Sequence, residues 1–142
     1  MSGSEGVPFA CTTEDGSFAQ TLVPRRVTQC ALSRICGACG ESLGRPIAFV
    51  GSESEAGRNA FHFPPLHPDC AEMLVAGPAA AQSGVLGQDE PVGRWVLLTT
   101  SGFEFVRPNR EDSDRRVSFV PNSIMNERRF TAGEPPDHGE RP

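Results

Sequence analysis

The chain has 142 residues, of which 37% are hydrophobic, and it contains 15 Gly and 13 Pro. This length suits one domain with irregular ends. The low apolar fraction predicts a loop-rich fold whose small core needs additional stabilisation, such as a structural metal. The formal net charge is −5, all 13 basic residues are Arg, and the excess acids lie near the two ends, so the acidity indicates solubility more than a basic partner.

Membrane insertion and secretion are not expected from this sequence. No stretch approaches the roughly 20 apolar residues of a membrane span. The N-terminus lacks the basic and apolar regions of a signal peptide. We therefore expect a cytoplasmic protein with no membrane contact, in which the five cysteines are reduced and either bind metal or stay free.

The first quarter of the chain carries weak secondary-structure signals. Residues 1–17 are rich in Gly, Ser and Thr and are predicted to form a disordered tail before a globular domain over residues 18–132. Residues 18–26 are predicted to be extended, because Pro24 opposes a helix. Residues 27–35 have an ambiguous pattern that allows a short helix or a strand.

The middle of the chain reads as a turn, two strands and a helix. The predicted elements are a Gly-rich turn at 36–40, a strand at 46–50, a polar loop at 52–57, a returning strand at 58–63 and a helix from His67 through Val75. Pro at the first helical position favours this helix start, and the Gly-Pro pair beyond the helix favours its end.

The last third is predicted to be a β-meander over residues 92–121, after a linker at 79–90. Its strands are expected at 94–100, 103–106 and 117–120, with a turn at 101–102 and Trp95 in the core. A final turn is expected at 125–130 and a disordered tail at 133–142. We expect an α+β fold.

Four residues form two pairs with the spacing of zinc ligands, namely Cys36, Cys39, His67 and Cys70. In a Cys-x2-Cys turn both sulfurs point to one side while backbone N–H groups donate to the thiolates. On a helix, residues three apart share a face, so the second pair can meet the same ion. The four side chains would close a tetrahedral Cys3His shell without an open position, which is typical of one structural Zn²⁺.

The order of a knuckle, a β-hairpin and a helix that carries the last two ligands resembles the treble-clef zinc finger, over residues 36–77. The segments "CGACGESLGRPIAFVG" and "PPLHPDCAE" are similar to short uncharacterised proteins of actinobacteria and their phages. The resemblance implies a small zinc domain that the β-meander extends, and it implies no activity.

His62 stands between two phenylalanines and is therefore expected to face outward from the second hairpin strand. A histidine there resembles the catalytic residue of His-Me finger nucleases, in which it activates a water. A surface histidine is the alternative interpretation. Cys11 is expected to be a thiol in the tail, and Cys30 a small buried hydrophobic residue.

Three functions stay open on this evidence. The first is a non-catalytic binding or adaptor module that contacts protein or nucleic acid, because the metal shell is closed. Arginines at 25, 26, 34 and 45 and six more between 107 and 129 could contact phosphates, although surface arginines are more often ion-paired. The second is a metal-dependent nuclease that uses His62. The third is a small biosynthetic or modifying enzyme with a pocket near His62 and Arg107.

Overall fold

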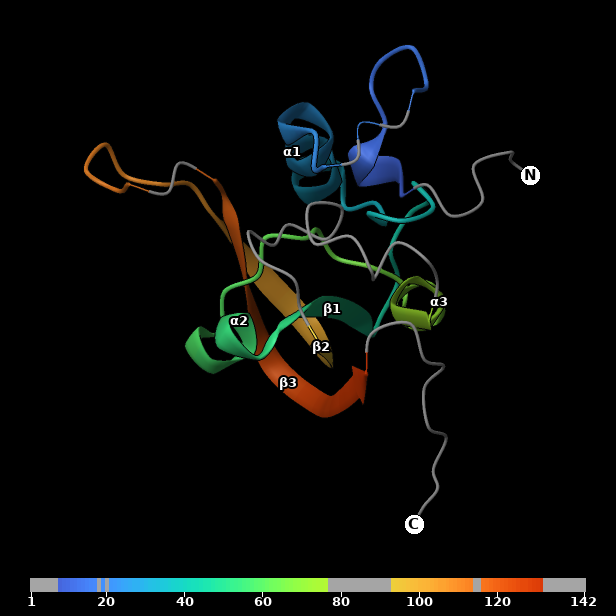
Figure 1. Ribbon diagram of the computed structural model, residues 1–142, viewed down its shortest axis with the longest axis vertical. Helices are drawn as coiled ribbons and strands as arrows, with labels where there is room; N and C mark the ends of the chain where they lie inside the picture. The colour runs from blue at the N-terminus through green and yellow to red at the C-terminus, as the bar shows by residue number, and fades with distance from the viewer. Residues whose placement is uncertain (1–7, 18, 20, 77–92, 114–115, 132–142) are drawn as a thin grey trace.

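The computed structural model describes residues 8–17, 19, 21–76, 93–113 and 116–131 (Figure 1). The described part is an α+β fold, as predicted. Its helices are the 3-10 helix η1 (Phe9–Cys11) and the α-helices α1 (Pro24–Ser33), α2 (Glu53–Arg58) and α3 (Pro68–Ala76). Its strands are β1 (Ile47–Ser52), β2 (Arg94–Val106) and β3 (Ser118–Thr131), which form one antiparallel sheet in the order β1-β2-β3.

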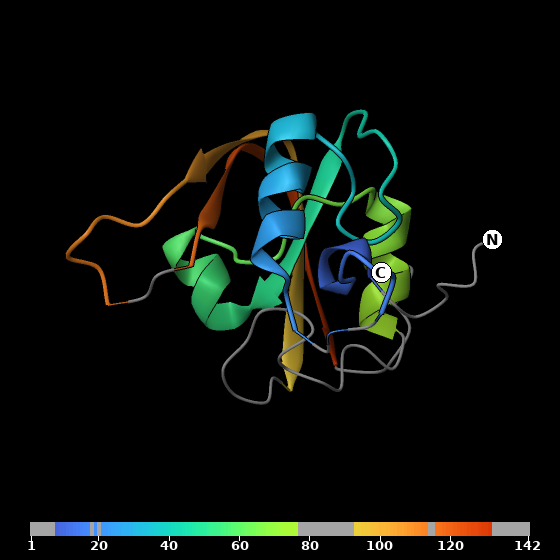
Figure 2. The same cartoon turned by 90° about the horizontal axis from the view of Figure 1, so that it is seen from above.

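Strand β1 is buried on both faces, because a helix packs on each side of it. Figure 2 shows α1 in front of β1 and α3 to the right of the strand. Ile47 and Phe49 belong to the apolar cluster that includes α1, whereas Ala48 and Val50 belong to the cluster that includes α3. This explains why β1 is a continuous apolar run and does not alternate. Trp95 is fully buried, as predicted.

The predicted β-hairpin is wrong, because residues 53–58 form helix α2 and no strand runs over 58–63. The Ser52 hydroxyl accepts a hydrogen bond from the Glu55 amide at 3.2 Å and so caps the start of α2. Strand β1 takes β2 as its partner instead, with Ile47 opposite Thr100 and Ser52 opposite Trp95. The predicted returning strand contributes only a single bridge to β3, at Phe61.

The C-terminal strands are longer than predicted. The expected turn at 101–102 is absent, since β2 continues to Val106 with an irregular register between Thr99 and Thr100. The expected turn at 125–130 is wrong as well, because β3 continues through it to Thr131. The predicted linker at 79–90, the end of the helix at Gly77 and the tail at 133–142 lie outside the described residues.

Two expectations for the N-terminal part also fail. Pro24 occupies the first turn of α1, where its missing N–H costs no hydrogen bond, so the extended segment ends before it. Of the two alternatives for residues 27–35, the helix is the one formed, as far as Ser33. The fold also includes η1, so the predicted tail boundary at residue 17 lies too far along the chain. None of the helices in the described ranges is long and apolar enough to cross a bilayer.

Candidate metal centre

The four predicted ligands come together in the structure. One ligand atom from each of Cys36, Cys39, His67 and Cys70 lies within 4.8 Å of all the others. They come from two elements that are far apart in the sequence, the loop after α1 and the first turn of α3. The described part of the chain therefore contains a Cys3His group that could hold a single metal ion.

Backbone hydrogen bonds shape the first half of the site as a knuckle, residues 36–40. The Cys36 sulfur accepts from the Ala38 amide at 3.3 Å, and the Cys36 carbonyl accepts from the Gly40 amide at 2.9 Å. Gly40 has φ = 78°, a left-handed conformation that suits glycine. Hydrogen bonds within the turn itself thus orient the sulfur of Cys36.

The start of α3 supplies the second half. The His67 carbonyl accepts from the Ala71 amide at 2.9 Å, so the helical turn brings Cys70 to the same face as His67. The His67 amide points to the Cys36 sulfur at 3.5 Å. Because the amides at a helix start are unpaired, they stabilise thiolate charge at this position.

The separations fit a tetrahedral ion. The Nδ1 atom of His67 lies 3.4 Å from the Cys39 sulfur and 3.8 Å from the Cys70 sulfur. With bonds of about 2.3 Å to sulfur and about 2.0 Å to nitrogen, the edges of such a tetrahedron measure about 3.5–3.8 Å. The donor types and the two separations from His67 Nδ1 therefore fit Zn²⁺.

The orientation of the His67 ring is set from outside the ligand shell. Its Nε2 atom lies 2.8 Å from the Ser42 carbonyl oxygen. A carbonyl can only accept, so Nε2 carries the proton and Nδ1 presents its lone pair to the cysteines. Such an outer hydrogen bond is the usual partner of a metal-binding histidine.

Burial disfavours ionised thiols at this site in the absence of a cation. It raises the pKa of Cys70 from its usual 9.0 to about 12, and the nearby Cys36 and Cys39 add to the rise. Burial also raises the pKa of Cys39. A divalent ion supplies the positive charge that these clustered sulfurs lack, so metal binding and thiol deprotonation are coupled.

The N-terminal segment supports the knuckle, which sequence reasoning missed. The Phe9 amide donates to the Ala38 carbonyl and the Ala10 amide to the Gly37 carbonyl, both at 2.9 Å. The Phe9 ring lies so close to Gly40 that an added Cβ would be 3.1 Å from it. No local pattern in this Gly- and Thr-rich segment signals that it pairs with a turn 30 residues away, because the pairing depends on tertiary structure.

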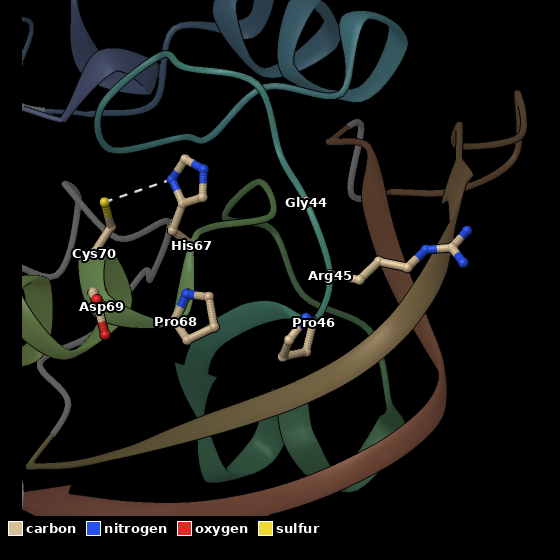
Figure 3. A pocket seen from close by; sticks show the side chains of 7 residues that line it. All are labelled: Gly44, Arg45, Pro46, His67, Pro68, Asp69 and Cys70. Carbon is tan, nitrogen blue, oxygen red and sulfur yellow. Dashed lines mark hydrogen bonds between the residues drawn. The ribbon is translucent and has the colours of Figure 1, made fainter.

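An open pocket adjoins the metal centre (Figure 3). Its cavity volume is about 470 Å³, and its lining residues are Gly44, Arg45, Pro46, His67, Pro68, Asp69 and Cys70. Figure 3 shows the Cys70 sulfur pointing at the His67 ring, while the Arg45 side chain extends away from both. Two of the four residues of the Cys3His group, His67 and Cys70, thus line this pocket, together with few other polar side chains.

His62 does not face outward, so that prediction is wrong. Its side chain is 7% exposed, and its Nδ1 atom lies 2.6 Å from Oε2 of Glu55, whose side chain is 2% exposed. The pair links α2 to the segment after it. Space for the Glu55 carboxylate exists because residue 51 is glycine: a Cβ at Gly51 would lie 2.2 Å from Oε1. Sequence reasoning found the histidine but not its partner.

The two remaining cysteines are buried. Cys30 is fully buried, as predicted, whereas the prediction of Cys11 as a tail thiol is wrong because it is also 0% exposed. Burial raises the pKa of each of these thiols to about 12. Both stay protonated near neutral pH, so neither has the activated thiolate that a nucleophile requires.

Comparison with known proteins adds nothing to these geometric findings. No family model matches the chain, and neither a curated protein nor a solved structure is detectably similar to it. The resemblances to the treble-clef finger and to actinobacterial and phage proteins therefore rest on the sequence segments alone. What stands is an α+β chain with a Cys3His group that could hold one metal ion.

Proposed function

We propose that this protein is a zinc-stabilised, non-catalytic binding or adaptor module that contacts protein or nucleic acid. The observation that carries the proposal is the closed Cys3His cluster, in which three sulfurs and one nitrogen lie within 4.8 Å of one another. Four protein ligands fill a tetrahedral shell and leave no position for a substrate or a reactive water. Such a shell supports a structural role for the ion.

The position of the cluster supports the same role. Zinc at this site would tie the knuckle to α3, and η1 is joined to the knuckle by the hydrogen bonds of the Phe9 and Ala10 amides. Cys36 belongs to the larger apolar cluster, together with Cys11, Leu66 and Val75. The free energy of zinc binding, about 10–16 kcal/mol for structural sites, would then be available to folding.

The knuckle and the helix-borne pair correspond to the two ligand-bearing parts of a treble clef. The hairpin that normally lies between them is replaced here by β1 and α2, with Ala48 bridging to Leu66 beside the metal centre. We interpret the site as a variant of that finger. The reduced thiols that it needs fit a cytoplasmic location.

Cobalt substitution tests the closed shell directly. We expect one Co²⁺ per chain, with the intense visible bands of a tetrahedral thiolate-rich site and no change in those bands when azide is added. If azide shifts those bands, the ion has an open position and the non-catalytic proposal fails.

The nuclease alternative loses its main support. A general base must reach a water beside the substrate, and His62 is instead buried against Glu55 at 2.6 Å. The pocket by the metal centre contains neither His62 nor Arg107, the two residues on which the biosynthetic alternative relied. The binding module is therefore the function that the geometry supports best.

A further inference from the structure

The distal half of β2 presents two phenylalanines on one face, each with an arginine stacked on it. Phe103 and Phe105 are two residues apart and so share a face of the sheet. The Arg34 guanidinium lies 5.1 Å from the centroid of the Phe103 ring, and the Arg107 guanidinium 5.1 Å from that of Phe105. We call these four residues the aromatic arm.

The aromatic arm is held rigidly by the core beneath it. Phe119 is buried, and the centroid of its ring lies 5.7 Å from that of Phe103 and 5.4 Å from that of Phe105. Phe103 also meets Phe49 edge-on at 5.8 Å. Phe103 and Phe105 are nevertheless only partly buried. A rigid, partly exposed pair of rings can stack with a planar group at a low cost in conformational entropy.

The arginines of the arm form no ion pair with the described residues. Arg25, Arg94, Arg128 and Arg129 each have a carboxylate partner. Arg34 and Arg107 form no ion pair with any described residue. Glu104 lies between the two phenylalanines in sequence but on the opposite face of the strand. The arm thus combines exposed aromatic surface with unpaired positive charge.

Arg34 reaches Phe103 from a backbone conformation that side chains rarely adopt. It ends α1 with φ = 54°, a position where glycine is usual, and its carbonyl accepts from the Leu43 amide at 3.0 Å. An arginine there keeps the strained conformation and gains a cation–π contact on the sheet. This observation is independent of the phenylalanine pair and points to the same surface.

From these contacts we infer that the aromatic arm binds single-stranded nucleic acid. Phosphates contact the guanidinium groups of Arg34 and Arg107, and unpaired bases stack on the exposed parts of the rings and on the outer faces of the guanidiniums. A duplex hides its base faces, so it cannot use the phenylalanines. The inference rests on the proposed function, because it names the class of partner for the binding module.

Fluorescence anisotropy tests this with the zinc-loaded full chain and two dye-labelled probes, an oligothymidylate and an oligouridylate of about 20 nucleotides, longer than the usual site of such surfaces. We expect binding that weakens with salt and is stronger than for a duplex of the same length. The two probes distinguish DNA from RNA as the source of the strand. Failure of both probes to bind at low salt overturns the inference.

Variants locate the surface. Phe105→Leu should weaken binding by roughly five-fold or more, because it removes a stacking ring, while Phe105→Trp should preserve binding. Arg107→Gln should lower the slope of log K against log salt by about 0.7, the value for one phosphate contact on a single strand. Arg94→Gln is the matched control, since it removes the same charge at the other end of β2, beside Glu53. Equal weakening by Arg94→Gln overturns the inference.

The outcome is separable from that of the proposed function. The zinc content, melting temperature and cobalt spectrum of each variant report on the metal centre, and measuring them does not require a nucleic acid. If those readouts stay normal and neither probe binds, the binding module stands and its partner is of another class. If azide changes the cobalt spectrum while the arm variants still weaken binding, the proposal of nucleic-acid binding by the aromatic arm is kept. The proposal of a closed metal shell is then rejected.

Discussion

The Nε2 atom of His67 lies 2.8 Å from the Ser42 carbonyl oxygen, on the side of the ring opposite the three cysteines. Ser42 follows the knuckle, so the loop that carries the first two ligands also orients the third. The two halves of the candidate metal centre are therefore connected by a hydrogen bond outside the ligand group. That connection makes the protonation of the His67 ring a direct report on the site.

The first prediction concerns this ring. With zinc bound, we expect His67 to be protonated at Nε2 and bare at Nδ1, with a slowly exchanging Nε2 proton, because the Ser42 carbonyl accepts from it. Long-range ¹H–¹⁵N correlation spectra distinguish the two tautomers. A metal bonded to Nε2 would give the reverse pattern and contradict the geometry of the site.

The second prediction concerns loss of the metal. Cys39→Ser or Cys70→Ala, or removal of zinc by a chelator, should abolish cooperative unfolding or soluble expression, since the fold would lose most of a term of about 10 kcal/mol. Metal content and thermal unfolding measure this. Cys30→Ala is the control: it removes a cysteine from the core but no ligand, and it should cost about 1–2 kcal/mol with zinc retained. A well-folded, zinc-free Cys39→Ser protein would show that the metal is dispensable.

The third prediction concerns Glu55 and His62. Removing one partner of this buried pair, by Glu55→Gln or His62→Ala, should lower the free energy of unfolding by about 1–3 kcal/mol, because the contact between the two buried side chains is weakened or lost. The exposed Glu53, which meets Arg129 at 3.0 Å, is the comparison, and Glu53→Gln should cost less than about 1 kcal/mol. Chemical denaturation of the singles and of the Glu55→Gln/His62→Ala double variant measures the coupling. Similar costs for Glu53 and Glu55 would show that burial of the pair contributes little.

The fourth prediction concerns Cys11 and alkaline pH. Its pKa is raised from 9.0 to about 12 by burial in the folded chain. Between these values the unfolded chain has released the proton and the folded chain has not, so the free energy of unfolding should fall as pH rises above 9. One thiol contributes a slope of at most about 1.4 kcal/mol per pH unit. The free energy of unfolding, measured by denaturation at a series of pH values, should therefore fall more steeply with pH for the unaltered protein than for Cys11→Ala above pH 9. Below pH 9 the two proteins should show the same dependence on pH.

Alkylation provides a second measure of the same burial. In the zinc-bound protein at pH 8, iodoacetamide should leave Cys11 and Cys30 unmodified, because each thiol is buried and protonated. Both should react fully after denaturation. Rapid labelling of Cys11 in the folded protein, read by mass spectrometry, would place it in a tail as the sequence pattern first indicated.

The Cys3His group was predictable because the geometry of each of its two pairs is local. The Cys36 and Cys39 spacing needs only a turn, and the His67 and Cys70 spacing needs only one turn of helix that Pro68 begins. Each pair is therefore arranged by its own few residues. The sequence by itself indicated the four residues of the Cys3His group and the α+β class, and the structure brings the two pairs close enough together that they could hold a single ion.

Strand pairing and burial were not predictable in this way. The alternation around His62 resembles a strand, yet β1 pairs with β2, which lies more than 40 residues further along the chain, and the Ser52 cap starts a helix in between. That cap was visible as Ser-x-x-Glu, a helix-start pattern. Whether His62 meets water or Glu55 depends on where α2 packs, and whether Cys11 is buried depends on η1 meeting the knuckle. Only the tertiary structure decides such contacts, because the free energy of burial comes from neighbours that are distant in sequence.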